Sequence, residues 1–341
     1  MSGAPDWRPS CSLKMLQLRA VMLQAVRAFF GERGYMEVET PCLSRDVVLD
    51  AWLEPYEVLS GDERWFLQTS PEAFMKRLLA AGVGSICQIS RVFRSAESGT
   101  RHNPEFTMIE WYGVGTTWQE QIALTEQLVR TVCSAAGKAL ANNPTDSWSV
   151  RPFDVVTYAD AFRRRYGVNV FDATGIDLIQ HAKSRGVSLP ESCLGEGTDD
   201  ILNAMLAIGI EPTLGGRDGD DRLRPAFLCD YPPSQAALAL TSDSPPKVAR
   251  RFELYIDGIE LCNGYQELTD PHELQRRERQ QNAARVDRSL AELPGAPRLA
   301  AAMAAGLPSC SGVALGFDRL VMIAAGATSI ADVLPFPEER A

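Results

Sequence analysis

The chain has few of the residues from which most metal centres and disulfide-bonded domains are built. Only three of its 341 residues are histidine, which argues against a metal centre with several histidine ligands. The eight cysteines are scattered, and no two lie closer than the 31 positions between Cys11 and Cys42. This spacing excludes a CxxC zinc or thioredoxin-like motif. Scattered single cysteines indicate small apolar packing residues in a reducing cytoplasm.

Long apolar runs and an excess of positive charge are also missing. No segment reaches about 18 uninterrupted apolar residues, the length of a membrane span. The N-terminal MSGAPDWRPSCS lacks the charged-then-apolar pattern of a secretory leader, so we expect a cytoplasmic protein with no membrane partner. Lys and Arg number 34 against 44 Asp and Glu, a formal net charge of −10. Binding along a nucleic-acid backbone needs clustered positive charge, so we expect no tRNA partner.

The pattern of the chain predicts an α+β fold with an antiparallel sheet flanked by helices. A composition with 45% hydrophobic and 23% charged residues is typical of a globular protein. Strands are expected in the first and last thirds and helices between them, roughly over 119–207. With no repeat or long linker, the chain is interpreted as a single domain, 1–341, with a helical insertion. Helices are expected at 13–30, 72–82 and 273–306, strands at 35–41, 63–71, 85–95, 106–114 and 226–232, a charged glycine-rich loop at 215–225, and a strand running into a helix at 311–326.

The segment RFELYIDGIELCNGYQEL (251–268) predicts a β-hairpin. Asp257–Gly258 is a favoured type I′ turn. The register set by that turn pairs Ile256 with Ile259, Tyr255 with Glu260, and Glu253 with Cys262. The carboxylates of Glu253 and Glu260 then lie diagonally across one face, within reach of one cation such as Mg²⁺. The alternative is a hairpin whose charged face is in water.

Beyond Asn263 the alternation must change if Asn263, Tyr265 and Glu267 are to point to that same face. The Asn263–Gly264 pair is the expected place for a bulge, because glycine tolerates the required backbone conformation. Glu267 would then be a third carboxylate of the site.

Three other segments contain candidate phosphate or substrate groups. In RVFRSAESGTRHNPEFTMIEWY (91–112), Arg94 and Arg101 suit phosphates or a carboxylate. Phe106 suits a flat base, although it also fits a core position, and Asn103–Pro104 fits an ordinary loop turn. These alternatives stay open at this point.

The other two segments place charged residues at helix starts. GVALGFDRL (312–320) puts Gly316 at a strand end and Arg319 in the first turn of a helix, where phosphate is favoured. The alternative is a surface pair of Asp318 with Arg319. Glu72 in TSPEAFMKRLL (69–79) begins a helix, where dipole stabilisation is the simpler explanation.

Together these segments resemble the class II aminoacyl-tRNA synthetases. EVETP (37–41), FRSAESGTRHNPEFTMIEWY (93–112) and GVALGFDRL (312–320) resemble motifs one, two and three of that family. TSPE and GIELCNGYQELTD (258–270) resemble its lysyl branch. Only about 36 residues precede EVETP, too few for the anticodon-binding barrel of lysyl-tRNA synthetases. The chain is therefore similar to their truncated paralogues, which ligate β-lysine to a lysine of elongation factor P with ATP.

The resemblance implies the site residues, with Mg²⁺ as the metal and Arg94 and Arg319 as the catalytic pair. ATP would be bound by Arg94, Ala96, Glu97, His102, Asn103, Phe106, Glu260, Leu261, Gly316 and Arg319. Lysine or β-lysine would be bound by Ser70, Glu72, Glu110, Tyr112, Asn263, Tyr265, Glu267 and Ala314. The metal would be held by Glu253 and Glu260. Ala314 stands where the synthetases carry glycine, and its methyl group would reshape the amino-acid pocket toward the β-isomer.

The resemblance also implies a reaction, a departure and an assembly. The expected reaction forms an acyl-adenylate and then an amide on elongation factor P. Where the synthetases read Arg-Asn-Glu, this chain reads Arg94-Ser95-Ala96 followed by Glu97, so Glu97 would replace the family glutamate only if the loop shifts. The family is dimeric through motif one, which predicts a homodimer with the 20–41 segment at the contact. A catalytically silent binding protein, or an enzyme with another acceptor, is the alternative.

Overall fold

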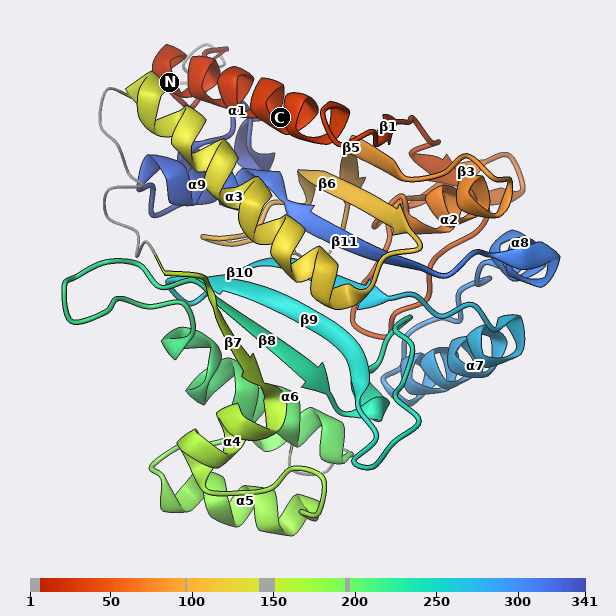
Figure 1. The fold of residues 1–341 in the computed structure, drawn as a ribbon. Helices are drawn as coiled ribbons and strands as arrows, with labels where there is room; N and C mark the ends of the chain where they lie inside the picture. The colour runs from red at the N-terminus through yellow and green to blue at the C-terminus, as the bar shows by residue number, and fades with distance from the viewer. Residues whose placement is uncertain (1–6, 96, 141–150, 194–196) are drawn as a thin grey trace, which may run out of the picture.

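The computed structural model describes residues 7–95, 97–140, 151–193 and 197–341, and its centre is an eight-stranded sheet (Figure 1). In sheet order, the strands are β1 (Met36–Glu37), β5 (Ile86–Phe93), β6 (Glu105–Val114), β11 (Cys310–Gly316), β10 (Ile259–Gln266), β9 (Ala249–Ile256), β8 (Ala226–Tyr231) and β7 (Asp154–Thr157). The predicted α+β class with a mainly antiparallel sheet is confirmed. Only the two outermost pairs, β1 with β5 and β7 with β8, are parallel.

Three helices pack together over the half of the sheet formed by β5, β6 and β11. They are α1 (Leu13–Gly31), α3 (Trp118–Leu140) and α9 (Phe317–Ala325). Their buried apolar side chains, including Phe30, Leu128 and Val321, form one core with Trp111 and Leu315 of the sheet. Because this core occupies one face, the polar residues of the same strands are left to the other face.

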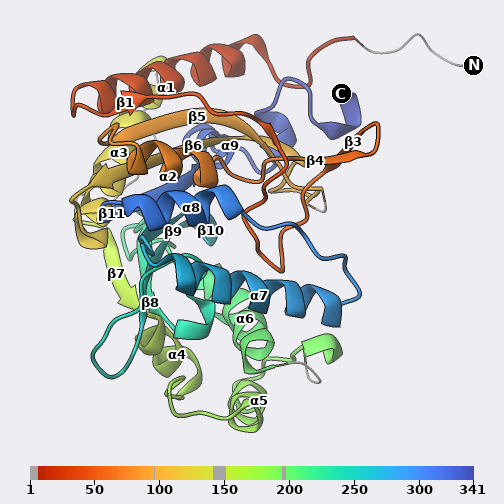
Figure 2. The same cartoon turned by 90° about the vertical axis from the view of Figure 1, so that its right-hand side faces the viewer.

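The remaining helices lie on either side of that polar face (Figure 2). On one side are α2 (Glu72–Ala80), α7 (Pro271–Asp287) and α8 (Pro297–Gly306); on the other are α4 (Tyr158–Tyr166), α5 (Gly175–Ser184) and α6 (Thr198–Gly209). A small second sheet, ordered β2 (Leu43–Ser44), β4 (Glu63–Leu67) and β3 (Glu57–Ser60), follows β1 in the chain. No helix in the part of the chain that the structure describes is long and apolar enough to cross a bilayer.

Two helix predictions need correction. The 119–207 insertion is mostly helical, but it contains β7, which pairs with a strand far along the chain; residues 141–150 and 194–196 of the prediction lie outside the described residues. The predicted helix at 273–306 is two helices, α7 and α8. Pro294 lies between the two helices, where proline cannot continue a helix, and Pro297 is the first residue of α8, a position that proline favours.

The hairpin of β9 and β10 has the predicted turn but a different register. Asp257 and Gly258 have φ of 52° and 69°, as a type I′ turn requires, and Ile256 pairs with Ile259 as predicted. The register then shifts between Glu260 and Cys262, so that Glu253 pairs with Asn263. The predicted Glu253–Cys262 pair is therefore wrong.

The predicted position of the bulge is wrong for a packing reason. The bulge lies around Leu261 and turns Cys262 into the apolar core, away from the carboxylates with which it was expected to share a face. Gly264 serves a different purpose, since a Cβ there would lie 2.4 Å from the ring of Phe252. The change of alternation nevertheless has the predicted effect, because Asn263, Tyr265 and Glu267 all face the cavity described next.

Candidate active site

A cavity of about 750 Å³ opens on the polar face of the sheet. Every predicted site residue that the structure describes lines it: Ser70, Glu72, Arg94, Glu97, His102, Asn103, Phe106, Glu110, Tyr112, Glu253, Glu260, Leu261, Asn263, Tyr265, Glu267, Ala314, Gly316 and Arg319. Ala96 lies outside the described residues. Groups that are far apart in the sequence are therefore brought to one cavity by the central strands and the loop between β5 and β6.

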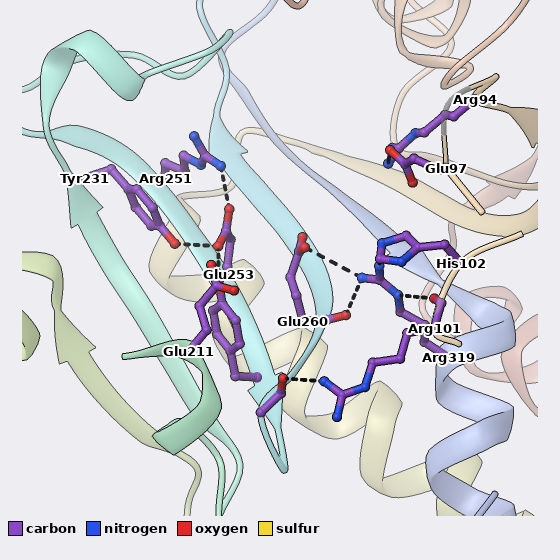
Figure 3. Close-up of polar contacts among 12 residues, drawn as sticks. Arg94, Glu97, Arg101, His102, Glu211, Tyr231, Arg251, Glu253, Glu260 and Arg319 are labelled. Atoms are coloured by element: carbon purple, nitrogen blue, oxygen red, sulfur yellow. Dashed lines mark hydrogen bonds and ion pairs between the residues drawn. The ribbon is translucent and has the colours of Figure 1, made fainter. Parts of the chain in front are cut away.

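At one end of the cavity, Arg319 joins the hairpin to the loop between β5 and β6 (Figure 3). Its Nη1 donates to the backbone oxygen of Glu260 at 2.7 Å, and its Nη2 lies 2.6 Å from Nε2 of His102. Burial and the charge of Arg319 lower the pKa of His102, so the ring is neutral and accepts this hydrogen bond. Arg101 of the same loop donates to the oxygen of Gly258 at the hairpin turn.

The neighbour of Arg319 does not form the surface pair considered from the sequence. Asp318 is buried, with 1% of its surface exposed; it lies 2.6 Å from Arg19 and accepts from the backbone N–H of Thr107. This anchors the start of α9 and leaves Arg319 directed at the cavity. A positive group at a strand-to-helix junction is a suitable phosphate site.

Arg94 and Phe106 form a second group with features of a ligand site. The guanidinium lies 5.0 Å from the centre of the Phe106 ring, and Nη1 lies 3.3 Å from the carboxylate of Glu97. Its Nε is buried without a hydrogen-bond partner among the described residues. Phe106 is half-buried and lines the cavity. A buried donor without a partner next to an accessible ring is an arrangement that a nucleotide can complete.

Asn103 has a structural part in this region. Its Nδ2 donates to the oxygen of Glu105 at 2.7 Å, and its Oδ1 accepts from the N–H of Glu338 at 2.9 Å. These bonds hold the loop in shape. They agree with the simpler interpretation of Asn103–Pro104 as a loop turn, although Asn103 also lines the cavity.

The two hairpin carboxylates differ in how much of their hydrogen-bonding capacity the protein uses. Glu253 is buried; it accepts from the hydroxyls of Tyr231 at 2.5 Å and Tyr255 at 2.6 Å, and it pairs with Arg251 (Figure 3). Glu260 is 41% exposed, and its carboxylate lies 3.6 Å from Arg319. The hairpin therefore does not simply present a charged face to water.

The acidity around these carboxylates favours a cation. Partial burial and the charge of Glu253 raise the pKa of Glu260. Burial together with the charges of Glu253 and Glu260 raises the pKa of Glu211 to about 7. No group of three or more metal-ligating side chains occurs in the described ranges. Mg²⁺ is commonly held by one or two carboxylates plus substrate phosphates, so the partly exposed Glu260 fits Mg²⁺ that arrives with a nucleotide. Glu253 would join it by exchanging a contact with Tyr231, Tyr255 or Arg251.

The other end of the cavity is acidic and closely packed. Glu110 is buried and accepts from Ser70 Oγ at 2.8 Å and from the hydroxyl of Tyr112 at 2.7 Å. Burial and the charges of Glu72 and Glu267 raise its pKa to about 8. Burial also raises the pKa of Glu267, to about 7. A positively charged ligand stabilises the ionised form of such carboxylates and lowers their pKa.

Gly312 and Ala314 of β11 form the floor of this acidic end. A Cβ on Gly312 would lie 2.3 Å from Tyr112 Cε1 and 2.5 Å from a carboxylate oxygen of Glu267. Ala314 pairs with Asn263 on one side and Glu110 on the other. The size of the side chains on β11 therefore limits what the acidic end can hold.

Comparisons with known proteins agree with this arrangement. The family model of class II tRNA synthetases (D, K and N) matches residues 5–340. Relatives from Salmonella paratyphi B (strain ATCC BAA-1250 / SPB7) and Salmonella schwarzengrund (strain CVM19633) are 40% identical to the chain over 347 residues. Each alignment covers 100% of this chain and 100% of the relative. Each of these relatives is named elongation factor P–(R)-β-lysine ligase.

The chain belongs to the class II aminoacyl-tRNA synthetase family. It is an ATP-dependent amino-acid ligase of that family. The segments that resemble the family motifs begin at the end of β1, run from the end of β5 through the loop and most of β6, and cover most of β11 with the start of α9. Because β1, β5, β6 and β11 are neighbours in the sheet, the motifs of this class II chain are adjacent in space.

Several residues in and beside the cavity were not predicted from the sequence. Tyr231, Arg251 and Glu211 surround Glu253 and Tyr255, and Lys76 lies between two carboxylates of the acidic end. Arg251 precedes Glu253 by two residues on a strand, so the alternation of the hairpin was an available signal. Tyr231 and Glu211 come from distant segments and had no local signal.

Proposed function

We propose that the chain activates a diamino acid, (R)-β-lysine or lysine, with ATP and transfers it to a lysine side chain of elongation factor P. The observation that carries this proposal is one cavity with two chemically different ends. Arg94 and Arg319 supply positive charge at the nucleotide end. Glu72, Glu110 and Glu267 supply negative charge at the other end, which suits a substrate with two ammonium groups.

In the first step, a carboxylate oxygen of the amino acid attacks the α-phosphorus of ATP. The new P–O bond forms as the bond from the α-phosphorus to the bridging oxygen breaks, and pyrophosphate leaves. Arg94 would hold the α-phosphate and the substrate carboxylate, and Arg319 would hold the γ-phosphate, so that charge is balanced where it develops. Glu253 and Glu260 would hold Mg²⁺, and the chemistry it would supply is neutralisation of phosphate charge.

The other residues orient the two substrates. Phe106 would stack on adenine, His102 and Asn103 would belong to the loop over ATP, and Glu97 would replace the family glutamate. Leu261 would contact ATP through its backbone, and Gly316 would allow ATP to approach closely. Ser70 and Glu72 would bind one amino group of the amino acid. The chain end would be recognised by Glu110, Tyr112 and Glu267, with Asn263, Tyr265 and Ala314 lining the pocket.

In the second step, an uncharged lysine amine of elongation factor P attacks the acyl carbonyl carbon. An amide bond forms, the acyl–phosphate bond breaks, AMP leaves with the electron pair, and the amine nitrogen gives up one proton. The names of the relatives support this acceptor. We propose a single catalytic domain over 1–341 that acts in the cytoplasm without tRNA.

Exchange of labelled pyrophosphate into ATP tests the first step. The proposal predicts exchange that depends on (R)-β-lysine or lysine, whereas a catalytically silent binding protein gives none with any amino acid. Added mass on purified elongation factor P, with none on tRNA, is the expected outcome for the second step. Charging of tRNA instead would assign the chain to the synthetase reaction.

A further inference from the structure

Lys76 is a buried lysine next to the acidic end of the cavity, and its two partners, Glu72 and Glu267, line that end. It lies on α2, one turn after Glu72, and 2% of its side chain is exposed. Its Nζ donates to Glu72 at 2.5 Å and lies 2.5 Å from a carboxylate oxygen of Glu267. Lysine is almost never fully buried unless it is paired, and this one joins a helix start to the end of β10.

The groups around Lys76 define the charge of this end of the cavity. Facing it or its partners are Glu72 on α2, Glu110 and Tyr112 on β6, Glu267 after β10 and Cys310 on β11. When a diamino acid binds, its ammonium groups favour the ionised form of the three glutamates. Their charge is then −3, and the ammonium of Lys76 brings the sum to −2. A diamino acid carries two ammonium groups, so its charge of +2 balances this end, while its carboxylate is left for the nucleotide end.

We propose that Lys76 is a positioning residue that bridges Glu72 and Glu267 and sets the charge of the pocket to match a substrate with two ammonium groups. This inference rests on the proposed function and adds a resident cation to it. Without Lys76 the two carboxylates, which both line the cavity, would repel each other. They would then take up protons or separate, and either change weakens the binding of a diamino acid.

The pKa shifts of Lys76 and Glu267 agree with this role. Burial opposes the charged form of Lys76, but the carboxylates of Glu267 and Glu72 raise its pKa above the ordinary value. Lys76 in turn counteracts the burial that raises the pKa of Glu267. Removing the ammonium therefore raises the pKa of Glu267 further and leaves it protonated at neutral pH.

The test compares Lys76→Met with the wild type and with Lys183→Met, an exposed lysine of α5. Binding of (R)-β-lysine and lysine is measured by calorimetry at several values from about pH 6.5 to about pH 8.5. For Lys76→Met we expect binding about tenfold weaker near neutral pH, equivalent to a shift of one pKa unit. The difference in affinity between Lys76→Met and the wild type should become smaller as pH rises, because the carboxylates ionise again. Lys183→Met should follow the wild type throughout.

A packing role would instead weaken binding by the same factor at every pH, and this result, or unchanged binding, would overturn the proposal. If Lys76→Met does not fold, the comparison is made between Glu267→Gln and Lys76→Met/Glu267→Gln. When Glu267 is already glutamine, removal of Lys76 should change the pH dependence of diamino-acid affinity much less than it does in the wild type. A change as large as in the wild type would contradict the proposal. If the wild type binds the diamino acid but the ratio of the wild-type affinity to the Lys76→Met affinity does not change with pH, only the role of Lys76 is refuted. If the wild type binds no diamino acid, the proposed function is refuted as well.

Discussion

At the residue scale, ligand binding in the cavity depends on carboxyl groups whose protonation state is determined by their surroundings. Glu72, Glu110 and Glu267 were all predicted from the sequence, because their segments resemble the lysyl branch of the family. The sequence could not show that Glu110 accepts from both Ser70 and Tyr112, since these contacts depend on how β6 lies against the start of α2. Lys76 was missed because a glutamate and a lysine four residues apart on a helix are usually a surface pair.

The raised pKa values predict how stability depends on pH. Glu110 and Glu267 have folded pKa values of about 8 and about 7, above their ordinary value of 4.5. Their contribution to stability is therefore complete below about pH 4.5 and is lost as pH rises through about 7 to 8. Thermal unfolding should show the stabilisation by added (R)-β-lysine growing over that range. A stabilisation that is largest at acidic pH would contradict these assignments.

Glu260 predicts a direct effect on activity. Because Glu260 would hold Mg²⁺ with the phosphates, Glu260→Gln should reduce pyrophosphate exchange by a factor on the order of 10² to 10³. The matched control is Asp257→Asn at the exposed turn of the same hairpin, where asparagine tolerates the positive φ. Near-normal exchange by Glu260→Gln would refute the assignment of Mg²⁺ to this residue.

At the element scale, the parts that local sequence determines were predicted, and the parts that depend on distant contacts were not. The type I′ turn follows from Asp257–Gly258 alone. The bulge around Leu261 depends on which side chains of β10 enter the core, and this was not visible in the segment itself. β7 was missed because its only sheet partner, β8, is separated from it by α4, α5 and α6.

Gly264 gives a prediction at this scale. A Cβ at this position would lie 2.4 Å from the Phe252 ring, so Gly264→Ala should destabilise the protein by about 1–3 kcal/mol through overpacking. Chemical denaturation measures the change. Gly31→Ala is the control, because a Cβ at Gly31 meets no atom within 4 Å. Equal losses for the two variants would show that the contact with Phe252 is unimportant.

At the scale of the whole molecule, the fold places the family motifs side by side and opens one cavity between the two sets of helices. The resemblance to the class II family already implied this arrangement, since it covers most of the chain. It also implies a homodimer through the 20–41 segment, which contains most of α1 together with β1. Met36 in that segment is 55% exposed, as a residue at an unpaired contact surface would be.

The assembly is tested by light scattering at micromolar concentration. We expect the mass of a dimer, and Met36→Glu should shift the molecule toward the monomer, because a charge at a buried contact is costly. Leu59→Glu, at an exposed position on β3, should leave the dimer intact. A wild-type monomer would contradict this expectation.

The measurement that tests the central claim most directly is a crystal structure with a nonhydrolysable ATP analogue, Mg²⁺ and (R)-β-lysine. We expect the triphosphate between Arg94 and Arg319, with Mg²⁺ at Glu260 and Glu253. We expect both amino groups of the ligand among Glu72, Glu110 and Glu267. A triphosphate bound elsewhere, or an acidic end that stays empty at saturating β-lysine, would contradict this claim.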